Sequence, residues 1–379
     1  MKNQVKIIFH IDLNAFYCSC AQIKEPYLKD KVFVVGGSST FRRGVITTAN
    51  YKARALGIHS AMNINDALNI YPKLVIVPTD FKLYRKYSKM FFDFLRKYTP
   101  LVLAASIDEA YMDVTDAVKD RHPLEFAEDI QKTLHDTIGL PSSIGIAPTL
   151  FLAKMASDFK KPMGITVLRK RDIVRKLFPL SIKEMHGIGI KTYPRLIDMG
   201  VATIGDFTKA ENKEKILTVM TEQAYEGFID HILGKSSDIV DPDKYAIPKS
   251  ISNETTLGSP LDHYESVLAI IEEQLLTSYQ RLVDEELVTK TVGIKLRDAN
   301  FKTFTRSFTF NDYTDDYDII HEQILDLFEK NFNQQPVRLI GASLSQLLLK
   351  KDLKIDINLF NYHQFTKRET ELYTKKEES

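Results

Sequence analysis

The chain has 379 residues, of which 44% are apolar, and this length and composition support two to four domains with ordinary hydrophobic cores. The formal net charge of +1 excludes a generally basic protein, so any site for nucleic acid must be a local patch. Two cysteines exclude a disulfide framework or a zinc site, and no apolar stretch approaches a membrane span, so we expect a soluble cytoplasmic protein with free thiols.

The first 78 residues alternate between short strands and helices. The first strand is expected to end at Asp12, and Asn14 is expected to cap the following helix, which runs to Ile23. A later helix places Tyr51 and Arg54 on one face because they are three residues apart. The other elements predicted here are strands at residues 32–35, 44–49 and 75–78 and a helix at residues 63–70.

Two adjacent carboxylates, Asp108 and Glu109, follow the apolar run Pro100 to Ala105. This stretch predicts a strand, a turn and a second strand with an acidic corner, although an Asp-Glu pair taken alone is more often a solvated turn. If the corner lies beside the end of the first strand, Asp12, Asp108 and Glu109 share one sheet edge. Three crowded carboxylates repel one another unless a hard cation lies between them, so the pattern favours Mg²⁺ or Mn²⁺ over zinc.

Helices are expected on both sides of this hairpin in the sequence, from Phe81 to Tyr98 and at residues 123–138. A strand at 142–147, a helix with Thr149 as its cap and a strand at 165–167 follow. Strands and helices that alternate irregularly, with acid at two strand ends, predict a sheet with helices on one of its faces.

The chain changes character near residue 168. From there to about residue 234 it is helical and punctuated by glycine, and a linker with two prolines follows. If residues 250–257 form an opening strand, residues 250–349 show the order strand, helix, strand, strand, helix, strand, which is the split βαβ type. Residues 248–350 contain 16 Asp and Glu against 10 Lys and Arg, but basic residues gather on the central strand pair, so one sheet face is expected to follow a nucleic-acid backbone.

Two segments, His10 to Tyr17 and Ser106 to Tyr111, together resemble the two catalytic motifs of the Y-family DNA polymerases, which copy damaged templates. The segment Met185 to Lys191 resembles a helix-hairpin-helix motif, in which backbone N–H groups reach a DNA phosphate. The resemblance covers about residues 5–350. It departs at Asn14, where the family often has a second acid, and in the hairpin, where the family usually has a proline.

The resemblance implies an α+β fold of several domains. These are a palm with a mixed or antiparallel sheet and helices, small fingers, a helical thumb with the helix-hairpin-helix, and a split βαβ little finger. The implied boundaries are residues 1–22 and 79–167 for the palm, 23–78 for the fingers, 168–238 for the thumb, 239–249 for a linker, 250–350 for the little finger and 351–379 for a tail.

The resemblance also implies roles for individual residues. The catalytic and metal-binding set, for two Mg²⁺ ions that Mn²⁺ can replace, is Asp12, Leu13, Asp108 and Glu109. The nucleotide-binding set is Phe16, Tyr17, Thr48, Tyr51, Arg54 and Lys161, with Tyr17 as the steric gate that excludes a ribose 2′-hydroxyl. The DNA-binding set is Gly187, Gly189, Lys191, Lys295, Arg297, Lys302 and Arg306. A tail segment with Leu359 and Phe360 resembles a clamp-binding peptide.

The implied activity is DNA synthesis from deoxynucleoside triphosphates on primer-template DNA, with low fidelity and no proofreading, by a monomer that binds the sliding clamp. Within the family, the size of the chain favours the polymerase IV type over a polymerase V-type catalytic subunit. A catalytically idle scaffold that binds DNA or the clamp is a second hypothesis, and the intact carboxylates argue against it. A nucleotide cyclase is a third, and the hairpin thumb and the last domain argue against that.

Overall fold

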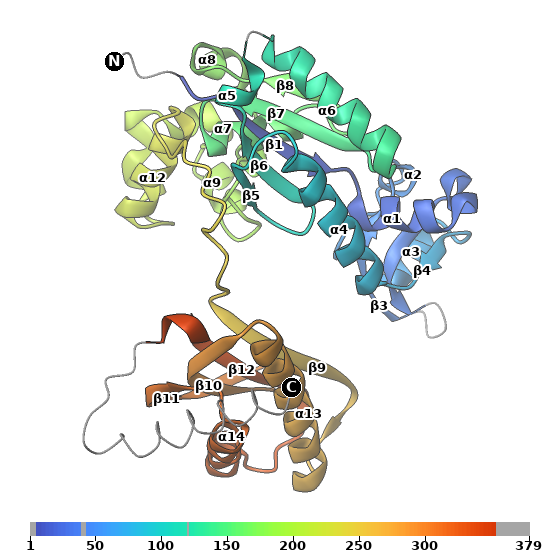
Figure 1. Cartoon of the computed structure of the whole chain (residues 1–379), viewed down its shortest axis with the longest axis vertical. Helices are drawn as coiled ribbons and strands as arrows, with labels where there is room; N and C mark the ends of the chain where they lie inside the picture. The colour runs from blue at the N-terminus through green and yellow to red at the C-terminus, as the bar shows by residue number, and fades with distance from the viewer. Residues whose placement is uncertain (1–4, 39–42, 120, 354–379) are drawn as a thin grey trace, which may run out of the picture. The chain divides into compact units, whose positions relative to one another are not determined.

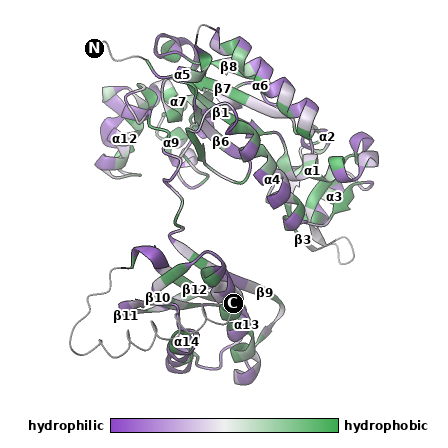
Figure 2. Ribbon diagram, viewed as in Figure 1, coloured by the Kyte–Doolittle hydropathy of each residue, from purple (hydrophilic) through white to green (hydrophobic). Residues whose placement is uncertain are grey.

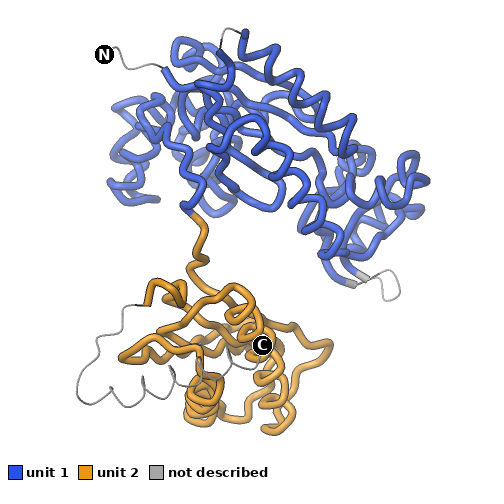
Figure 3. Tube along the Cα trace, in the orientation of Figure 1, with its two compact units in different colours: residues 1–244 blue, residues 245–379 orange. Residues whose placement is uncertain are grey.

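The computed structural model describes residues 5–38, 43–119 and 121–353. They fall into two compact units, residues 1–244 and 245–379 (Figure 3). The first unit contains a five-stranded and a three-stranded sheet, and the second contains a four-stranded sheet. None of the helices within the described ranges is both long and apolar enough to cross a membrane.

The five-stranded sheet of the first unit has the strand order β5-β6-β1-β7-β8 (Figure 1). Only β7 and β8 are parallel, so the predicted mixed sheet is confirmed. Its strands are β1 (Ile8–Leu13), β5 (Val102–Ala104), β6 (Glu109–Asp113), β7 (Ser142–Ala147) and β8 (Ile165–Val167).

Helices cover both faces of this sheet, and the prediction that they cover one face was wrong. Every residue of β1 is buried, which is typical of a central strand that is packed on both sides. Because side chains alternate along a strand, Phe9 and Ile11 pack with α4 (Phe81–Leu95) and α6 (Pro123–Ile138), whereas Ile8 packs with α7 (Leu150–Asp158). Asp12 follows Ile8 by four residues, so it points to the α7 side.

Asn14 does not cap the helix after β1, and that prediction was also wrong. Helix α1 (Phe16–Lys24) begins after Ala15, which is left-handed and makes no side-chain cap. Asn14 instead donates from Nδ2 to the Ser143 hydroxyl at 3.0 Å, and its Oδ1 accepts from the Met163 N–H at 2.8 Å. A buried amide needs such partners, so Asn14 joins β1 to β7 and to the loop before β8.

Smaller elements complete the first unit. The three-stranded sheet has the order β3-β2-β4 and carries its own apolar cluster, apart from the main core. Its elements are β2 (Phe33–Ser38), β3 (Arg43–Ala49), β4 (Val75–Val77), α2 (Tyr51–Arg54) and α3 (Ile64–Ile70). The remaining helices are α5 (Thr115–Val118), α8 (Ile173–Lys176), α9 (Tyr193–Asp198), α10 (Ile204–Phe207), α11 (Lys213–Ile216) and α12 (Glu222–Ile232).

The second unit has the predicted strand and helix order. Its elements are β9 (Ser250–Leu261), α13 (Tyr264–Asp284), β10 (Leu287–Asp298), β11 (Thr303–Thr314), α14 (Tyr317–Asn331) and β12 (Val337–Leu349). The sheet order β11-β10-β12-β9 has only antiparallel neighbours, so β9 and β10 run in the same direction with β12 between them. This arrangement is a split βαβ unit. In Figure 2, α13 alternates between hydrophobic and hydrophilic residues, as expected for a helix that covers a sheet.

Candidate active site

The structure brings the three predicted carboxylates to one sheet edge. Strands β1 and β6 are antiparallel neighbours, and Asp12 lies directly opposite Glu109. The N–H of Leu13 donates to the carbonyl oxygen of Asp108 at 3.0 Å, which holds the turn before β6 against the end of β1. The Ser106 hydroxyl donates to the Asp108 carboxylate at 2.7 Å. Leu13 has a buried side chain, so only its backbone carbonyl can serve as a ligand.

Two lysines from one segment face these carboxylates. Lys161 donates from Nζ to Oδ2 of Asp12 at 2.6 Å. Lys154, on α7, donates to Oε1 of Glu109 at 2.5 Å and lies 3.3 Å from Oδ2 of Asp12. Asp158 pairs with both lysines, at 2.7 Å from Lys161 and 3.4 Å from Lys154. Two partly buried cations, Lys154 and Lys161, therefore pair with three acids, Asp12, Glu109 and Asp158.

The close approach of Asp12 and Glu109 separates their pKa values. Burial raises the pKa of Glu109 well above its usual range, and its contact with Asp12 adds to the rise. Burial also acts to raise the pKa of Asp12, but the hydrogen bond from Glu109 and the ammonium groups of Lys161 and Lys154 outweigh it and lower that pKa. Burial raises the pKa of Asp108 as well. Negative charge is therefore crowded at this edge.

The donor set fits a hard divalent cation. Carboxylate and carbonyl oxygens are the ligands that Mg²⁺ and Mn²⁺ prefer, and crowded carboxylates gain most from a positive charge between them. Within the described residues, no group of three or more His, Cys, Asp or Glu side chains is arranged to hold a metal, and Asp12 and Glu109 instead contact lysine ammonium groups. A cation would have to displace at least one of these ammonium groups.

Lys154 was not predicted from the sequence. The available signal was a lone charge among the first eight residues of α7, which are otherwise apolar or small. A charged residue on a helix that is buried against a strand needs an acidic partner. Nothing in the local sequence says that this partner is the carboxylate pair on β1 and β6.

Replacing Lys154 with Met is expected to tighten Mn²⁺ binding to the DNA-free protein by about 5-fold or more. The change keeps the side-chain volume but removes a positive charge next to Asp12 and Glu109. Repulsion between that ammonium group and an Mn²⁺ ion bound by the same carboxylates is worth at least ~1 kcal/mol. The measurement is an Mn²⁺ titration followed by electron paramagnetic resonance. Lys160→Met, at an exposed neighbour, is the matched control. Equal Mn²⁺ affinity in wild type and Lys154→Met would contradict the inference that the Lys154 ammonium group competes with a metal ion for these carboxylates.

Three predicted nucleotide-binding residues lie where β3 leads into α2. The Arg54 guanidinium lies over the Tyr51 ring, 4.9 Å from its centroid, so the two share a face as predicted. Arg54 uses Nε to donate to the Ala49 carbonyl at 2.9 Å, which leaves its other nitrogens without an acidic partner among the described residues. The Tyr51 hydroxyl is buried and has no hydrogen-bond partner within the same residues. Thr48 precedes them on β3, opposite Val35. These unpaired donors suit a phosphate.

Tyr17 is held in an aromatic cluster on the first turn of α1. Its ring stacks on Tyr84 with centroids 4.1 Å apart, and it meets Phe81 edge to face at 6.2 Å. Packing of this kind fixes the ring, as a steric gate requires. The prediction that Phe16 contacts the nucleotide is not supported for its side chain, which is only 2% exposed and belongs to the core.

The predicted DNA-binding residues of the first unit lie on a tight turn. Gly187 has a φ of +92°, a conformation that favours glycine, whereas Gly189 has open space around its Cα. Lys191 is exposed just beyond the turn. Such a turn leaves backbone N–H groups accessible to an anion.

The four predicted basic residues of the second unit do not share one sheet face. Lys295 pairs with Glu254 at 2.6 Å across Gly341, and Arg297 donates to the Thr303 hydroxyl at 2.7 Å. Arg306 lies opposite the buried Ile294 and donates to Asn331 of α14 at 3.0 Å, so it belongs to the helix side of the sheet. The expectation of one basic face was therefore wrong for Arg306.

The fourth predicted basic residue, Lys302, lies outside the strands. Lys302 is exposed in the turn between β10 and β11, and its N–H donates to the Asp298 carboxylate at 2.8 Å. The predicted clamp-binding residues Leu359 and Phe360 lie outside the described residues.

Comparisons with known proteins agree with the motifs. A model of the impB/mucB/samB family matches residues 11–158, which contain all three carboxylates, and a model of that family's C-terminal domain matches residues 248–357. DNA polymerase IV of Bacillus velezensis is 40% identical over 369 residues, or 97% of this chain and 89% of that protein. DNA polymerase IV 1 of Bacillus subtilis is 37% identical over 375 residues, which again cover 97% of this chain and 89% of that protein.

Solved structures show the same fold. A Y-family DNA polymerase chimera matches with a TM-score of 0.80 at 24% identity, and the match covers 90% of this chain and 99% of the other. DinB from Sulfolobus solfataricus matches with a TM-score of 0.63 at 25% identity, covering 89% and 98%. These likenesses confirm the predicted α+β fold of several domains.

Proposed function

Since this chain belongs to the impB/mucB/samB family and is a DNA-directed DNA polymerase of the Y family, we propose that it copies damaged templates with low fidelity, by nucleotidyl transfer at a site for two metal ions. The observation that supports this most is the pairing of Asp12 with Glu109, with Asp108 held at the same edge. Because the curated relatives compared here are named DNA polymerase IV, a polymerase V-type catalytic subunit is not favoured.

The residues of the site have separate roles in the proposed reaction. Asp12, Asp108, Glu109 and the Leu13 carbonyl would hold two Mg²⁺ ions, for which Mn²⁺ can substitute. When bound, the ions stabilise the negative charge of the primer 3′-oxygen and of the leaving pyrophosphate. Lys161, together with Thr48, Tyr51 and Arg54, binds the triphosphate. Tyr17 closes the sugar side of the pocket against a 2′-hydroxyl. No separate protein base is required.

The proposal extends to the contacts with DNA. The turn at Gly187 and Gly189, with Lys191, binds a backbone phosphate in the thumb, residues 168–238. Lys295 and Arg297 contact DNA from the little finger, residues 250–350, where Lys295 lies opposite Gly341, which has no side chain. Because Lys295 is already neutralised by Glu254, this domain contributes a shallow salt dependence.

The other domain assignments are part of the same proposal. Residues 1–22 and 79–167 form the palm, and residues 23–78 form the fingers. The tail segment with Leu359 and Phe360 remains a predicted contact with the sliding clamp, and the enzyme is proposed to act as a monomer.

Lesion bypass tests the translesion part of the proposal. Primer extension with Mg²⁺ on templates that carry an abasic site, a bulky guanine adduct or a thymine dimer is expected to give products longer than the lesion position on at least one of them. A polymerase with a proofreading nuclease, run in parallel, should stop before each lesion. Wild-type enzyme that extends an undamaged template but stops before all three lesions would contradict the translesion role and leave polymerase activity in place.

A further inference from the structure

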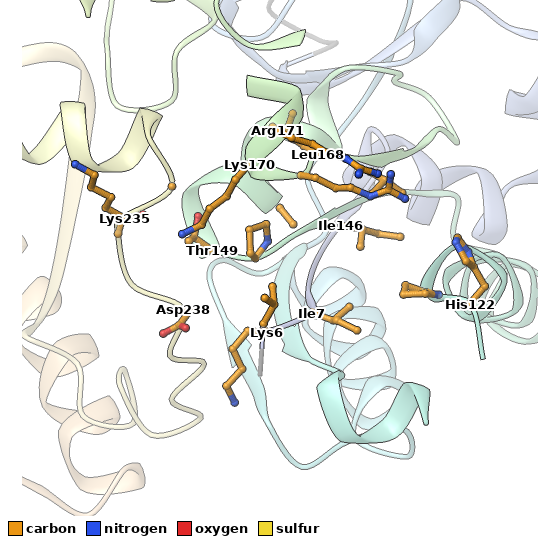
Figure 4. Close-up of a pocket in the computed structure, with 18 residues that line it drawn as sticks. Lys6, Ile7, His122, Ile146, Thr149, Leu168, Lys170, Arg171, Lys235 and Asp238 are labelled. Carbon is orange, nitrogen blue, oxygen red and sulfur yellow. The ribbon is translucent and has the colours of Figure 1, made fainter. Parts of the chain in front are cut away.

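A cavity of about 860 Å³ lies in the first unit, away from the carboxylates (Figure 4). Its lining includes Ile7, which directly precedes β1, and Ala147, which ends the antiparallel neighbour β7. Asp12 lies near the other end of β1, so the cavity and the catalytic edge are separated by about 15 Å along that strand. Thr149 also lines the cavity and caps α7, the helix that carries Lys154.

The floor of the cavity is apolar and its rim is basic. Ile7, Ile146 and Leu168 supply apolar side chains from the edge of the central sheet and the residue after β8. The rim carries the consecutive cations Arg169, Lys170 and Arg171, together with Lys6 and Lys235, against a single acid, Asp238. Such a combination is specific for a ligand with an apolar body and a concentrated negative charge.

Several of these cations have no acidic partner. Lys170, Arg171 and Lys235 form no ion pair with any residue in the described part of the chain, whereas Lys6 pairs with Asp113 at 2.6 Å. The hydroxyl of Ser236, which also lines the cavity, is buried without a hydrogen-bond partner among the described residues. An unpaired buried hydroxyl and unpaired cations at one cavity are the donors that a phosphate group would satisfy.

Two helix ends add positive potential. Pro123 begins α6 and Thr149 caps α7, and both residues line the cavity, so the N-terminal ends of these helices meet it. In Figure 4 the Lys170 side chain points toward the side of the view where Lys235 lies, whereas Arg171 lies above Leu168, and His122 and Lys235 are at opposite sides. The positive charge therefore comes from the protein backbone as well as from side chains.

We propose that this cavity binds a nucleoside polyphosphate at a site separate from the catalytic one. The volume falls within the usual range for small-molecule sites, so the apolar floor can take a base and sugar. Arg169, Lys170 and Arg171 offer a polyphosphate cationic donors at more than one place on the rim, and arginine forks bind phosphate through two parallel hydrogen bonds.

The test is calorimetric titration of ATP, in EDTA, into the full chain. Wild type is expected to bind, and Lys170→Glu/Arg171→Glu is expected to bind at least ~10-fold more weakly, since it reverses two rim charges. Lys132→Glu, an exposed lysine on α6 outside the cavity, is the matched control and is expected to bind as wild type does. Equal ATP affinity in wild type and the double variant, or no binding by wild type, would overturn the proposal.

Two further titrations distinguish ATP binding in this cavity from ATP binding at the catalytic site and from binding of phosphate alone. Arg54→Ala removes a proposed contact of the catalytic site and is expected to leave ATP binding in EDTA unchanged, so a loss would place the ATP there and overturn the proposal. Tripolyphosphate is expected to bind at least ~10-fold more weakly than ATP, because it has no body for the apolar floor. Equal affinity for ATP and tripolyphosphate would overturn the proposal as well. So would a Lys170→Glu/Arg171→Glu variant that binds duplex DNA more weakly but binds ATP as wild type does.

Discussion

Asp108→Asn is expected to lower the rate of nucleotide incorporation by at least ~10³-fold and to leave DNA binding intact. The asparagine keeps the shape of the side chain and can still accept the hydrogen bond from Ser106, so the turn before β6 is preserved. It removes a negative charge and a proposed metal ligand where charge is expected to develop in the transition state. Single-turnover extension of a labelled primer gives the rate, and fluorescence anisotropy gives the DNA affinity.

Asp116→Asn is the matched control, since Asp116 is an exposed carboxylate in the same unit, outside the proposed site. We expect it to extend primers at the wild-type rate. If Asp108→Asn retained a rate within ~10-fold of wild type, Asp108 would not belong to the metal-binding set, and the proposed mechanism would need another ligand.

Tyr17→Ala is expected to raise ribonucleotide incorporation, relative to deoxyribonucleotide incorporation, by about 10²-fold. The Tyr17 ring is fixed against Tyr84 and Phe81, so a 2′-hydroxyl cannot push it aside without breaking these contacts. An alanine leaves open space where the ring stood. The measurement is the ratio of kcat/KM for dATP and ATP in single-nucleotide insertion opposite thymine.

Two further variants define what the gate requires. Tyr17→Phe is expected to keep the wild-type sugar selectivity, because the ring rather than the hydroxyl fills the space. Tyr27→Ala, at a tyrosine that is 61% exposed, should not change selectivity. Unchanged selectivity in Tyr17→Ala would remove Tyr17 from the role of gate and leave the metal site unaffected.

Local signals made the edge with the three carboxylates and several helices and strands predictable. The bounds of α6 match the predicted helix because Pro123 begins its first turn and the left-handed Gly139 ends it. Asp12 and the Asp108-Glu109 pair each lie at the end of a strand with its own apolar pattern. Pairing between β1 and β6, the condition on which the predicted shared edge depended, then joins the carboxylates.

Contacts between distant parts of the chain were not predictable. Asn14 has the side chain of a helix cap, but Ser143 and the Met163 backbone offer it buried partners, and these override the local preference. Lys154 meets Glu109 only because α7 packs on the central sheet. The face of Arg306 depends on the register between β10 and β11, which contains a shift between Thr289 and Thr291.

The central claim is that this chain joins nucleotides to a primer under the direction of a template. Single-nucleotide insertion tests it most directly, with four primer-templates that differ only in the templating base and each deoxynucleoside triphosphate supplied alone with Mg²⁺. We expect the complementary nucleotide to be inserted fastest opposite every base, with measurable misinsertion and no product in EDTA. Insertion that is the same for all four templates, or no insertion while DNA is bound, would contradict the account.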